Sequence, residues 1–392
     1  MAMPATTWSW SAATRRASCA LALCRVACRW RSPSMPELAL VLGGTAYGGW
    51  TSIYVHRSLE EVAGSFELSL TERWPEHEQP LVIQPGAACV VTIDGKPVIT
   101  GYVDAVDQGY DATNHTLNVS GRDKTADLVD CSATFGKGEW RNAKLDQVAR
   151  DLSSPFGITV RASGDLGAPF PSFAIEPGES AYDCLERAAR QRGLLLASNG
   201  AGELVVGQAG TGKVGTALRS GENLLSGAVR NDNASRYSQY TVLGQRAGSD
   251  LVSGAAAAHV KAQATDTGVA RFRPLVIVDE DQGDMASFQR RAKWEASVRA
   301  ARALTYTALV QGWTHASGLW ETNTLVQVYD PVLRLARELL VRDVDYGLDA
   351  SSGQVSQLVL TPAEAYSILK MPAKQKAPRR KKRRDSDDED AF

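Results

Sequence analysis

Residues 88–106 read ACVVTIDGKPVITGYVDAV, two apolar runs joined by the dipeptide Asp94-Gly95. Asp and Gly tolerate the positive φ angles of a tight two-residue turn, so this stretch predicts a β-hairpin. Just upstream, Phe66, Leu68 and Leu70 alternate with polar neighbours, which is typical of a strand with one buried face. We therefore predict a first β-barrel domain over residues 35–122.

The hydrophobic period changes after residue 122. The residues spaced as on one face of a helix are Leu145, Val148, Ala149 and Leu152. A further helix is expected after Ser180, whose hydroxyl can cap it, and Gly193 is expected to end it. Two short apolar runs joined by Asn199-Gly200-Ala201-Gly202 predict another hairpin. This segment is predicted to be an α+β domain, residues 123–215.

Strand patterns return in residues 216–245 and 303–370, which predicts a second β-barrel domain. Residues 246–302 are expected to be an insertion, made of a loop low in large apolar residues and a long Ala- and Arg-rich helix from about residue 283 to 304. The expected fold class is α+β, mainly β, with two similar barrels and the α+β domain between them.

The two ends of the chain differ in composition from the rest. Residues 1–34 are rich in Arg, Ser, Cys and Trp, and we expect an extension without a fold of its own, with the folded protein beginning at Met35-Pro36. Residues 371–392 combine a basic run, Arg379–Arg384, with an acidic run, Asp385–Asp390, and are expected to be a disordered tail. The sequence contains no stretch of about 18 uninterrupted apolar residues, so we predict no membrane-spanning helix.

Composition bounds the class of function. The chain has 392 residues, 44% of them hydrophobic, and a formal net charge of −1. This balance gives no field that would draw the whole protein to nucleic acid or to an anionic membrane. The six cysteines and five histidines are scattered without metal-ligand spacing. We therefore predict no catalytic residue, no metal site and no cofactor, and a protein that is not an enzyme.

One motif is typical of an enzyme. Gly207, Gly212 and Lys213 have the spacing of a phosphate-binding loop, but Val214 stands where a Ser or Thr should ligate magnesium. Glycines also interrupt the segment that should form the following helix. We interpret Lys213 as a solvated residue in a Gly-rich connection, and a nucleotide hydrolase is the less favoured alternative.

Two clusters of acidic residues are candidate sites. Residues Asp279 to Asp284 lack the spacing of a calcium loop and are interpreted as a turn before the long helix. Asp343 and Asp345 should lie on one face of a strand. One strand alone does not make a catalytic pair.

Four blocks of sequence, taken in order, resemble the baseplate hub proteins of contractile phage tails. They are YGGWTSIYVHRSLEEVAGSFELSLTERW (47–74), PGESAYDCLERAARQRGLLLASNGAGELVVG (177–207), YSQYTVLGQ (237–245) and VQGWTHASGLWETNTLVQVYDPVLRLARELLVRDVDY (310–346). The resemblance is to the Mu-like tail hub, a relative of late-control and type VI secretion spike hubs, and covers about residues 37–370.

The resemblance implies a trimeric ring in which six tube-type barrels face a hexameric tail tube while threefold symmetry faces a trimeric spike. The implied partners are the tail tube protein, a central spike protein on a separate chain and baseplate wedge proteins. DNA would pass through the ring without specific binding. The implied location is the virion tail baseplate, and the host cytoplasm during assembly. The alternative is the hub of a related contractile injection or type VI-like secretion apparatus.

Three tryptophans near strand entrances, Trp50, Trp313 and Trp320, are the candidate anchor residues. Large aromatic side chains dominate the energetics of both cores and interfaces. The sequence leaves open which of these two roles they have.

Overall fold

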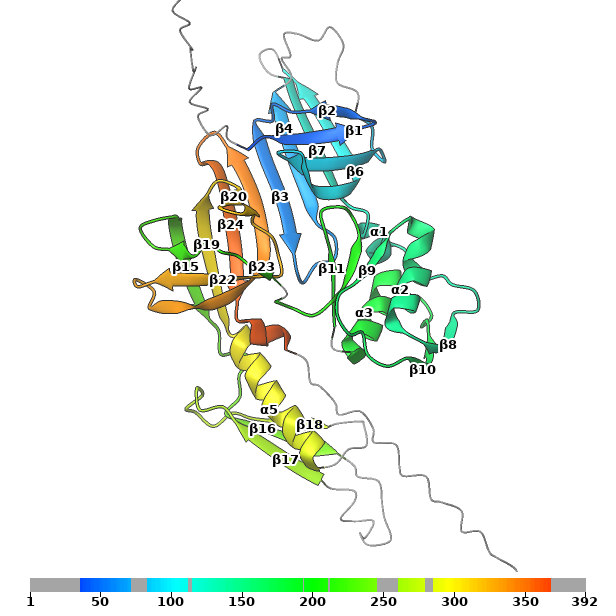
Figure 1. Cartoon of the computed structure of the whole chain (residues 1–392), viewed down its shortest axis with the longest axis vertical. Helices are drawn as coiled ribbons and strands as arrows, with labels where there is room; N and C mark the ends of the chain where they lie inside the picture. Colours follow the sequence, from blue (N-terminus) through cyan, green and yellow to red (C-terminus); the bar gives the residue numbers. More distant parts are fainter. Residues whose placement is uncertain are drawn as a thin grey trace, which may run out of the picture. The chain divides into compact units, whose positions relative to one another are not determined.

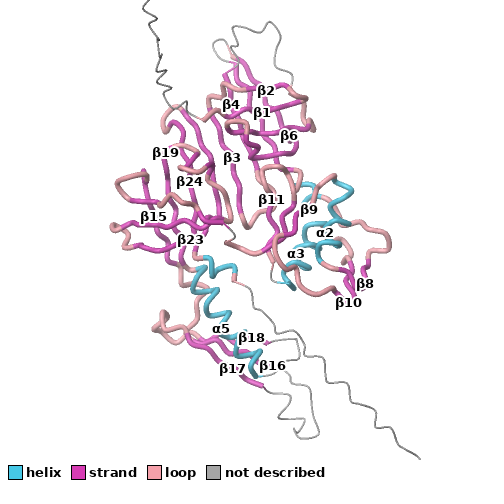
Figure 2. Tube along the Cα trace, viewed as in Figure 1, coloured by secondary structure: helices cyan, strands magenta, loops and turns pink. Residues whose placement is uncertain are grey.

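The computed structural model describes residues 36–71, 83–111, 115–192, 194–210, 212–244, 260–278 and 285–367. Strands dominate, and the helices are confined to a few segments (Figures 1 and 2). The expectation of a mainly β, α+β fold is confirmed. Several residues for which predictions were made above lie outside the described residues. They are residues 1–34, residues 371–392, the carboxylates at 279–284 and Gly193, together with two of the five scattered histidines, His77 and His259.

The first group of strands follows the predicted hairpin pattern. Its members are β1 (Leu38–Leu42), β2 (Thr45–Tyr47), β3 (Ser52–Ser58), β4 (Ser65–Thr71), β5 (Ala88–Ile93), β6 (Lys96–Tyr110) and β7 (His115–Asp123). Asp94 and Gly95 have φ angles of 50° and 75° and turn β5 into β6, the geometry that favours Asp-Gly. Phe66, Leu68 and Leu70 are buried, so the predicted alternation in β4 is confirmed.

The second group of strands comes mainly from the last third of the chain. Its members are β15 (Leu224–Asn231), β19 (Leu304–Gln311), β22 (Thr324–Asp330), β23 (Leu335–Asp349) and β24 (Gly353–Thr361). Two short strands, β13 (Gly212–Lys213) and β14 (Leu218–Arg219), pair with β22. A small hairpin of β20 (Thr314–His315) and β21 (Gly318–Leu319) lies between β19 and β22 in sequence.

The two groups share one strand topology. The first has the order β3-β4-β7-β6-β5 and the second the order β15-β19-β24-β23-β22. The long strands β6 and β23 both have 15 residues, and their partners β7 and β24 both have nine. A bulge interrupts each long strand, at Asp104 in β6 and at Arg342 in β23. A bulge bends its strand, so β6 and β23 can each pair with different neighbours along one edge.

The two groups join through β3 and β23, and this joint makes one 14-stranded sheet. The described residues contain no strand pairing that closes either group into a ring, so the arrangement as two barrels stays a prediction. Residues His56 and Asp345, which meet at the joint, are 289 positions apart in the chain. No local sequence pattern specifies such a pairing, which is why the sequence predicted two separate units.

The α+β segment forms as expected between the two groups. Its elements are α1 (Ala126–Asp130), β8 (Glu139–Ala143), α2 (Leu145–Ser153), η1 (Ser154–Phe156), β9 (Val160–Ala162), β10 (Phe170–Ala174), α3 (Ala181–Arg192), β11 (Leu195–Ser198) and β12 (Leu204–Gly207). The predicted apolar face of α2 is buried. The Ser180 hydroxyl accepts a hydrogen bond from the Asp183 amide at 3.0 Å, and β11 and β12 form the predicted hairpin.

Two predicted boundaries are wrong. The predicted α+β domain extends to residue 215, but β13 (Gly212–Lys213) pairs with β22 of the second strand group. The strand β16 (Gln239–Gly244), assigned above to the second barrel, pairs instead with β17 (Val260–Thr265) and β18 (Pro274–Val278). The helix α5 (Met285–Arg302) covers this small sheet, and Phe288 packs on it. A Cβ atom on Gly244 would lie 2.2 Å from the Phe288 ring, so the glycine makes room for this packing. After β24 the chain forms η2 (Ala363–Tyr366), which contacts α5.

Candidate assembly interface

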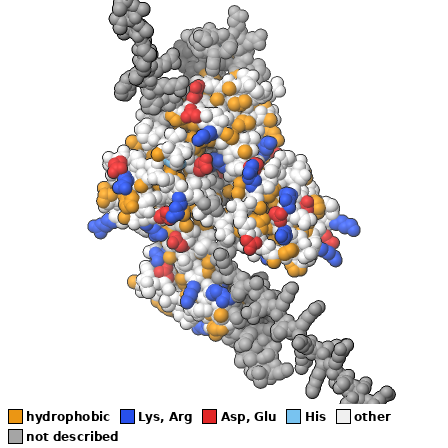
Figure 3. All heavy atoms as spheres, viewed as in Figure 1, with side chains coloured by type: hydrophobic (Ala, Val, Ile, Leu, Met, Phe, Trp, Pro, Cys, Tyr) orange, Lys and Arg blue, Asp and Glu red, His pale blue; other side chains and the backbone are white. Residues whose placement is uncertain are grey.

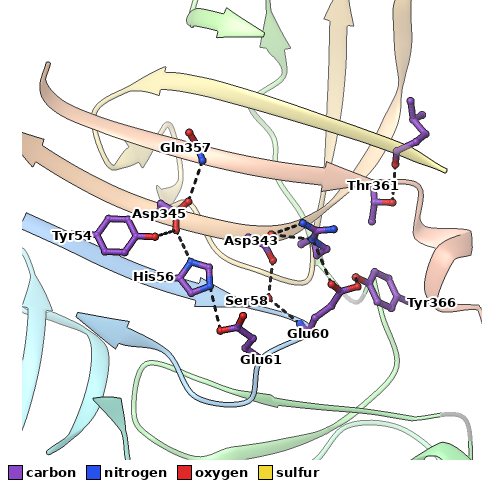
Figure 4. A network of polar contacts seen from close by, with 12 residues as sticks. Tyr54, His56, Ser58, Glu60, Glu61, Asp343, Asp345, Gln357, Thr361 and Tyr366 are labelled. Atoms are coloured by element: carbon purple, nitrogen blue, oxygen red, sulfur yellow. Dashed lines mark hydrogen bonds and ion pairs between the residues drawn. The ribbon is translucent and has the colours of Figure 1, made fainter. Parts of the chain in front are cut away.

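A polar network lines one side of the joint between β3 and β23 (Figure 4). The Asp345 carboxylate lies 2.5 Å from His56 Nδ1 and accepts a hydrogen bond from the Tyr54 hydroxyl at 3.1 Å. Glu61 lies 3.7 Å from the other ring nitrogen of His56. Residues from both strand groups therefore share one hydrogen-bonded cluster.

The second carboxylate of the network is Asp343, two positions earlier on β23. It accepts a hydrogen bond from the Ser58 hydroxyl at 2.7 Å and pairs with the Arg342 guanidinium at 2.8 Å. Glu60 accepts a hydrogen bond from the Tyr366 hydroxyl at 2.6 Å. Asp343 and Asp345 point to the same side of the strand, as the sequence suggested, but each already has partners from the fold. The pair is a structural clamp across the joint.

The electrostatics of the network favour a charged clamp. The hydrogen bond to Asp345 raises the pKa of His56 above its ordinary value, against the opposing effect of burial. Burial, followed by the charge of Asp345, raises the pKa of Tyr54 to about 12. Tyr54 therefore stays a neutral donor at neutral pH, and His56 is biased toward the cation that attracts Asp345.

The opposite face of the same joint is apolar. Val55 of β3 and Val344 of β23 are both fully buried, and Tyr346 is almost so. The hydroxyl of Tyr346 donates to the carbonyl oxygen of Trp320. The joint thus combines a dry side and a charged side, which fixes its register, because a slip of one residue would exchange the two.

The three candidate tryptophans are buried in the main core, with exposed fractions of 5% for Trp50, 0% for Trp313 and 2% for Trp320. Trp50 precedes β3, Trp313 follows β19 and Trp320 precedes β22, so they do not occupy equivalent places in the two strand groups. The indole N–H groups of Trp50 and Trp313 donate to backbone carbonyls at 3.1 and 2.9 Å. The buried rings of the three tryptophans leave little exposed area for a partner to cover. Their assignment as core or interface anchors is tested by the substitution described in the Discussion.

The phosphate-loop motif has no phosphate-loop geometry. Gly207 ends β12, whereas Gly212 and Lys213 form β13, which pairs with β22 and is not followed by a helix. The Lys213 ammonium is 2.8 Å from a carboxylate oxygen of Glu338. The lysine therefore has a carboxylate partner on β23, and the helix N-terminus that would bind phosphate is missing from this part of the described chain.

A pocket of about 290 Å³ lies where β6 and β7 meet α1. The Arg122 guanidinium in it is 2.7 Å from Asp104 and 2.8 Å from Asp130. Its charge is already matched, so the pocket does not offer an anion a free cation. The described residues also contain no group of three or more His, Cys, Asp or Glu side chains placed to hold a metal ion.

The surface carries both signs of charge. On the face shown in Figure 3, basic and acidic side chains lie interspersed among apolar ones. This agrees with the net charge of −1. No helix in the described part of the chain is long and apolar enough to cross a membrane.

Comparison with known domain families defines the class of protein. Four family models match in succession, in an order that follows the elements described above. They are "Mu phage baseplate assembly protein GpP-like, N-terminal" (37–123), "Baseplate hub protein gp44-like, second domain" (125–208), "Tail protein NMB1110-like, third domain" (236–294) and "Mu phage baseplate assembly protein GpP, fourth domain" (284–368). The class is therefore a phage tail baseplate protein.

Whole-chain relatives identify the family. The chain is 37% identical over 334 residues to baseplate hub protein gp44 of Escherichia phage Mu, covering 83% of this chain and 87% of that protein. The crystal structure of the 43 kDa tail protein of prophage MuSo2 from Shewanella oneidensis matches with a TM-score of 0.75 and 36% identity, covering 85% and 99% of the two chains. The chain belongs to the gp44-like baseplate hub family, and the predicted resemblance is confirmed.

A more distant structure shares the fold. The tail protein from Neisseria meningitidis MC58 matches with a TM-score of 0.70 and 23% identity, covering 85% of this chain and 99% of that one. The protein is a phage baseplate hub component of the virion tail. The relatives are named as baseplate hub and tail proteins, which supports a non-enzymatic role at the level of the family.

Proposed function

We propose that three copies of this chain form a ring in a contractile phage tail that connects a hexameric tail tube to a trimeric central spike. The observation that carries this proposal is the repeated strand topology, β3-β4-β7-β6-β5 followed by β15-β19-β24-β23-β22. Each chain thereby supplies two similar units, and three chains supply six positions around one axis.

The internal repeat explains how one protein can present two symmetries. The hexameric tube ring would meet six similar units. The parts present once per chain, namely the α+β segment and the β16–β18 sheet with α5, would occur three times. The threefold set suits a trimeric spike. Tube, spike and wedge proteins are the proposed partners, and DNA would pass through the ring without sequence-specific contacts.

The proposal is tested by stoichiometry and symmetry in assembled tails. Quantitative mass spectrometry of purified tails should give half as many copies of this chain as of subunits in one tube ring. Imaging of the same tails should show threefold density at the hub beneath sixfold density in the tube. Six copies per tail in a true sixfold ring, or a single copy, would contradict the adaptor role.

A further inference from the structure

Each strand group has an edge segment that lacks a strand partner among the described residues. In β15, residues 226–231 pair with β19 on one side only. In β6, residues 105–110 pair with β7 on one side only, because β5 pairs only up to Tyr102. Unpaired edges offer a row of free backbone donors and acceptors to another strand. Both strand groups thus have an open edge of this kind.

The strands of the internal joint between β3 and β23 correspond to the strands that carry the two open edges. The correspondence follows from the cross-strand partners, starting at the residue just before each bulge and moving one strand at a time. In the first group the successive partners are Val103, Gly121, Phe66 and Val55, and in the second they are Val341, Leu360, Tyr306 and Val229. By this correspondence β15 is the counterpart of β3, and residues 105–110 of β6 are the counterpart of residues 343–348 of β23. The pair β3–β23 is closed within the chain, whereas the equivalent pair, β15 with β6, would need two copies.

We propose that β15 of one copy pairs antiparallel with residues 105–110 of β6 in the next copy, in the register of the β3–β23 joint. Transferring that register places Val229 opposite Gln108 and Arg230 opposite Asp107. The partner is a second copy of this chain. This inference rests on the proposed ring and specifies the seam between its subunits.

Charge supports the register. Asp107 is the counterpart of Asp345, and Arg230 is the counterpart of His56, which lies 2.5 Å from Asp345 in the internal joint. An acidic residue on the long strand would therefore face a basic residue on the edge strand at both joints. In the single chain Asp107 is exposed, and Arg230 is 78% exposed and bonded to Asp232 two positions away. Such a surface pair is weak and can exchange partners.

Burial supports the same register on the other face. Val55 and Val344 are fully buried in the internal joint, whereas their counterparts Val229 and Val106 are only half-buried against the same core. Tyr110, at the end of β6, is 85% exposed. Pairing between copies would cover these side chains and leave Arg230 and Asp107 together on the polar side. Their counterparts in the internal joint, His56 and Asp345, lie together in this way in Figure 4.

The seam is directional, since one copy supplies β15 and the next supplies β6. A head-to-tail contact of this kind closes into a ring when its rotation divides a full turn. The internal joint and the seam between copies use equivalent strands in the same register. The rotation that relates the two strand groups within a chain should therefore be similar to the rotation that relates neighbouring groups across the seam. Three chains would then give a continuous band of six strand groups.

Cross-linking in assembled tails tests this seam. The full chain would carry Asp107→Cys and Arg230→Cys in a background in which Cys19, Cys24, Cys28 and Cys131 are serine, and tails would be treated with a short bismaleimide. We expect covalent species of two and three chains on a denaturing gel. The matched control, His56→Cys with Asp345→Cys, should link within one chain and therefore migrate as a single chain on the same gel.

The outcomes separate the seam from the hub role. If the double-cysteine chain is present in tails and stays unlinked between copies while the control links internally, the seam is wrong and the hub role stands. If the unsubstituted chain itself is absent from tails, the hub role fails. Charge exchange provides an independent measurement if cysteines impair assembly. Asp107→Arg or Arg230→Asp alone should lower incorporation at least about tenfold, and the double exchange should restore it. Failure of the double exchange to restore incorporation would also overturn the seam.

Discussion

The two long strands β6 and β23 have equal length, equivalent bulges and equivalent hairpin partners, yet their surroundings differ. Residues 343–348 of β23 are covered by β3 and hold a partly buried clamp around Asp345. Residues 105–110 of β6 are mostly exposed and end in Tyr110. The comparison teaches that strand topology can repeat while edge pairing does not, and that the unpaired copy of a repeated joint marks a surface for assembly.

The largest effect is expected inside the first strand group. A Cβ atom on Gly101 of β6 would lie 1.8 Å from the carbonyl oxygen of Arg122, so Gly101→Ala must displace β7. We expect a loss of about 4 kcal/mol or more in the free energy of unfolding, or no folded protein. Urea denaturation of the purified chain measures it.

The matched control for Gly101 lies on the same strand. At Gly109 the new Cβ atom would approach only the Thr116 hydroxyl, at 3.2 Å. Gly109→Ala should cost less than about 1 kcal/mol in the isolated chain. Equal losses for the two variants would show that close strand contact does not explain the glycine at position 101. The equivalent position in β23 is Leu339, which shows that only the first group needs this close approach.

The second effect concerns the core shared by both groups. Trp320→Ala removes an indole ring that is 2% exposed, and cavity formation should cost about 3–5 kcal/mol. A lowered thermal midpoint with normal incorporation into tails would assign Trp320 to the core. An unchanged midpoint with reduced incorporation would assign it to an interface instead.

A third experiment compares the closed joint directly with the open edge. Asp345→Ala leaves His56 and Tyr54 without their shared acceptor and should cost about 2 kcal/mol. Asp107→Ala changes an exposed side chain and should alter the stability of the isolated chain by less than about 0.5 kcal/mol. Chemical denaturation of both variants measures the difference. Similar losses would mean that β6 residue 107 is already engaged within one chain.

The smallest effect is the pH dependence of the closed joint. Asp345 raises the pKa of His56 in the folded state above the ordinary value of 6.5, so the folded state binds the proton more tightly than the unfolded state. The resulting stabilisation is fully present below about pH 6.5 and is lost as pH rises through the folded pKa. We expect about 1 kcal/mol or less from this partly buried pair. Denaturation midpoints between pH 5.5 and 8.5 should lose this component in His56→Gln, and an unchanged pH profile in that variant would contradict the assignment.

The sequence determined the local elements because turns and periodicity are short-range properties. Asp94-Gly95 specified the hairpin of β5 and β6, and the spacing of Leu145, Val148, Ala149 and Leu152 specified the buried face of α2. The four sequence blocks also placed the chain in the hub family, as the relatives confirm.

Tertiary structure alone decided how these elements pair. His56 and Asp345 carry no mutual signal across 289 positions, and a strand pattern shows which face is buried without showing which strand lies beside it. For the same reason β16 could not be assigned to the small sheet with β17 and β18 from its own residues. Strand edges bond through backbone groups that every residue except proline carries in full, so the closed joint and the two open edges became visible only in the folded chain.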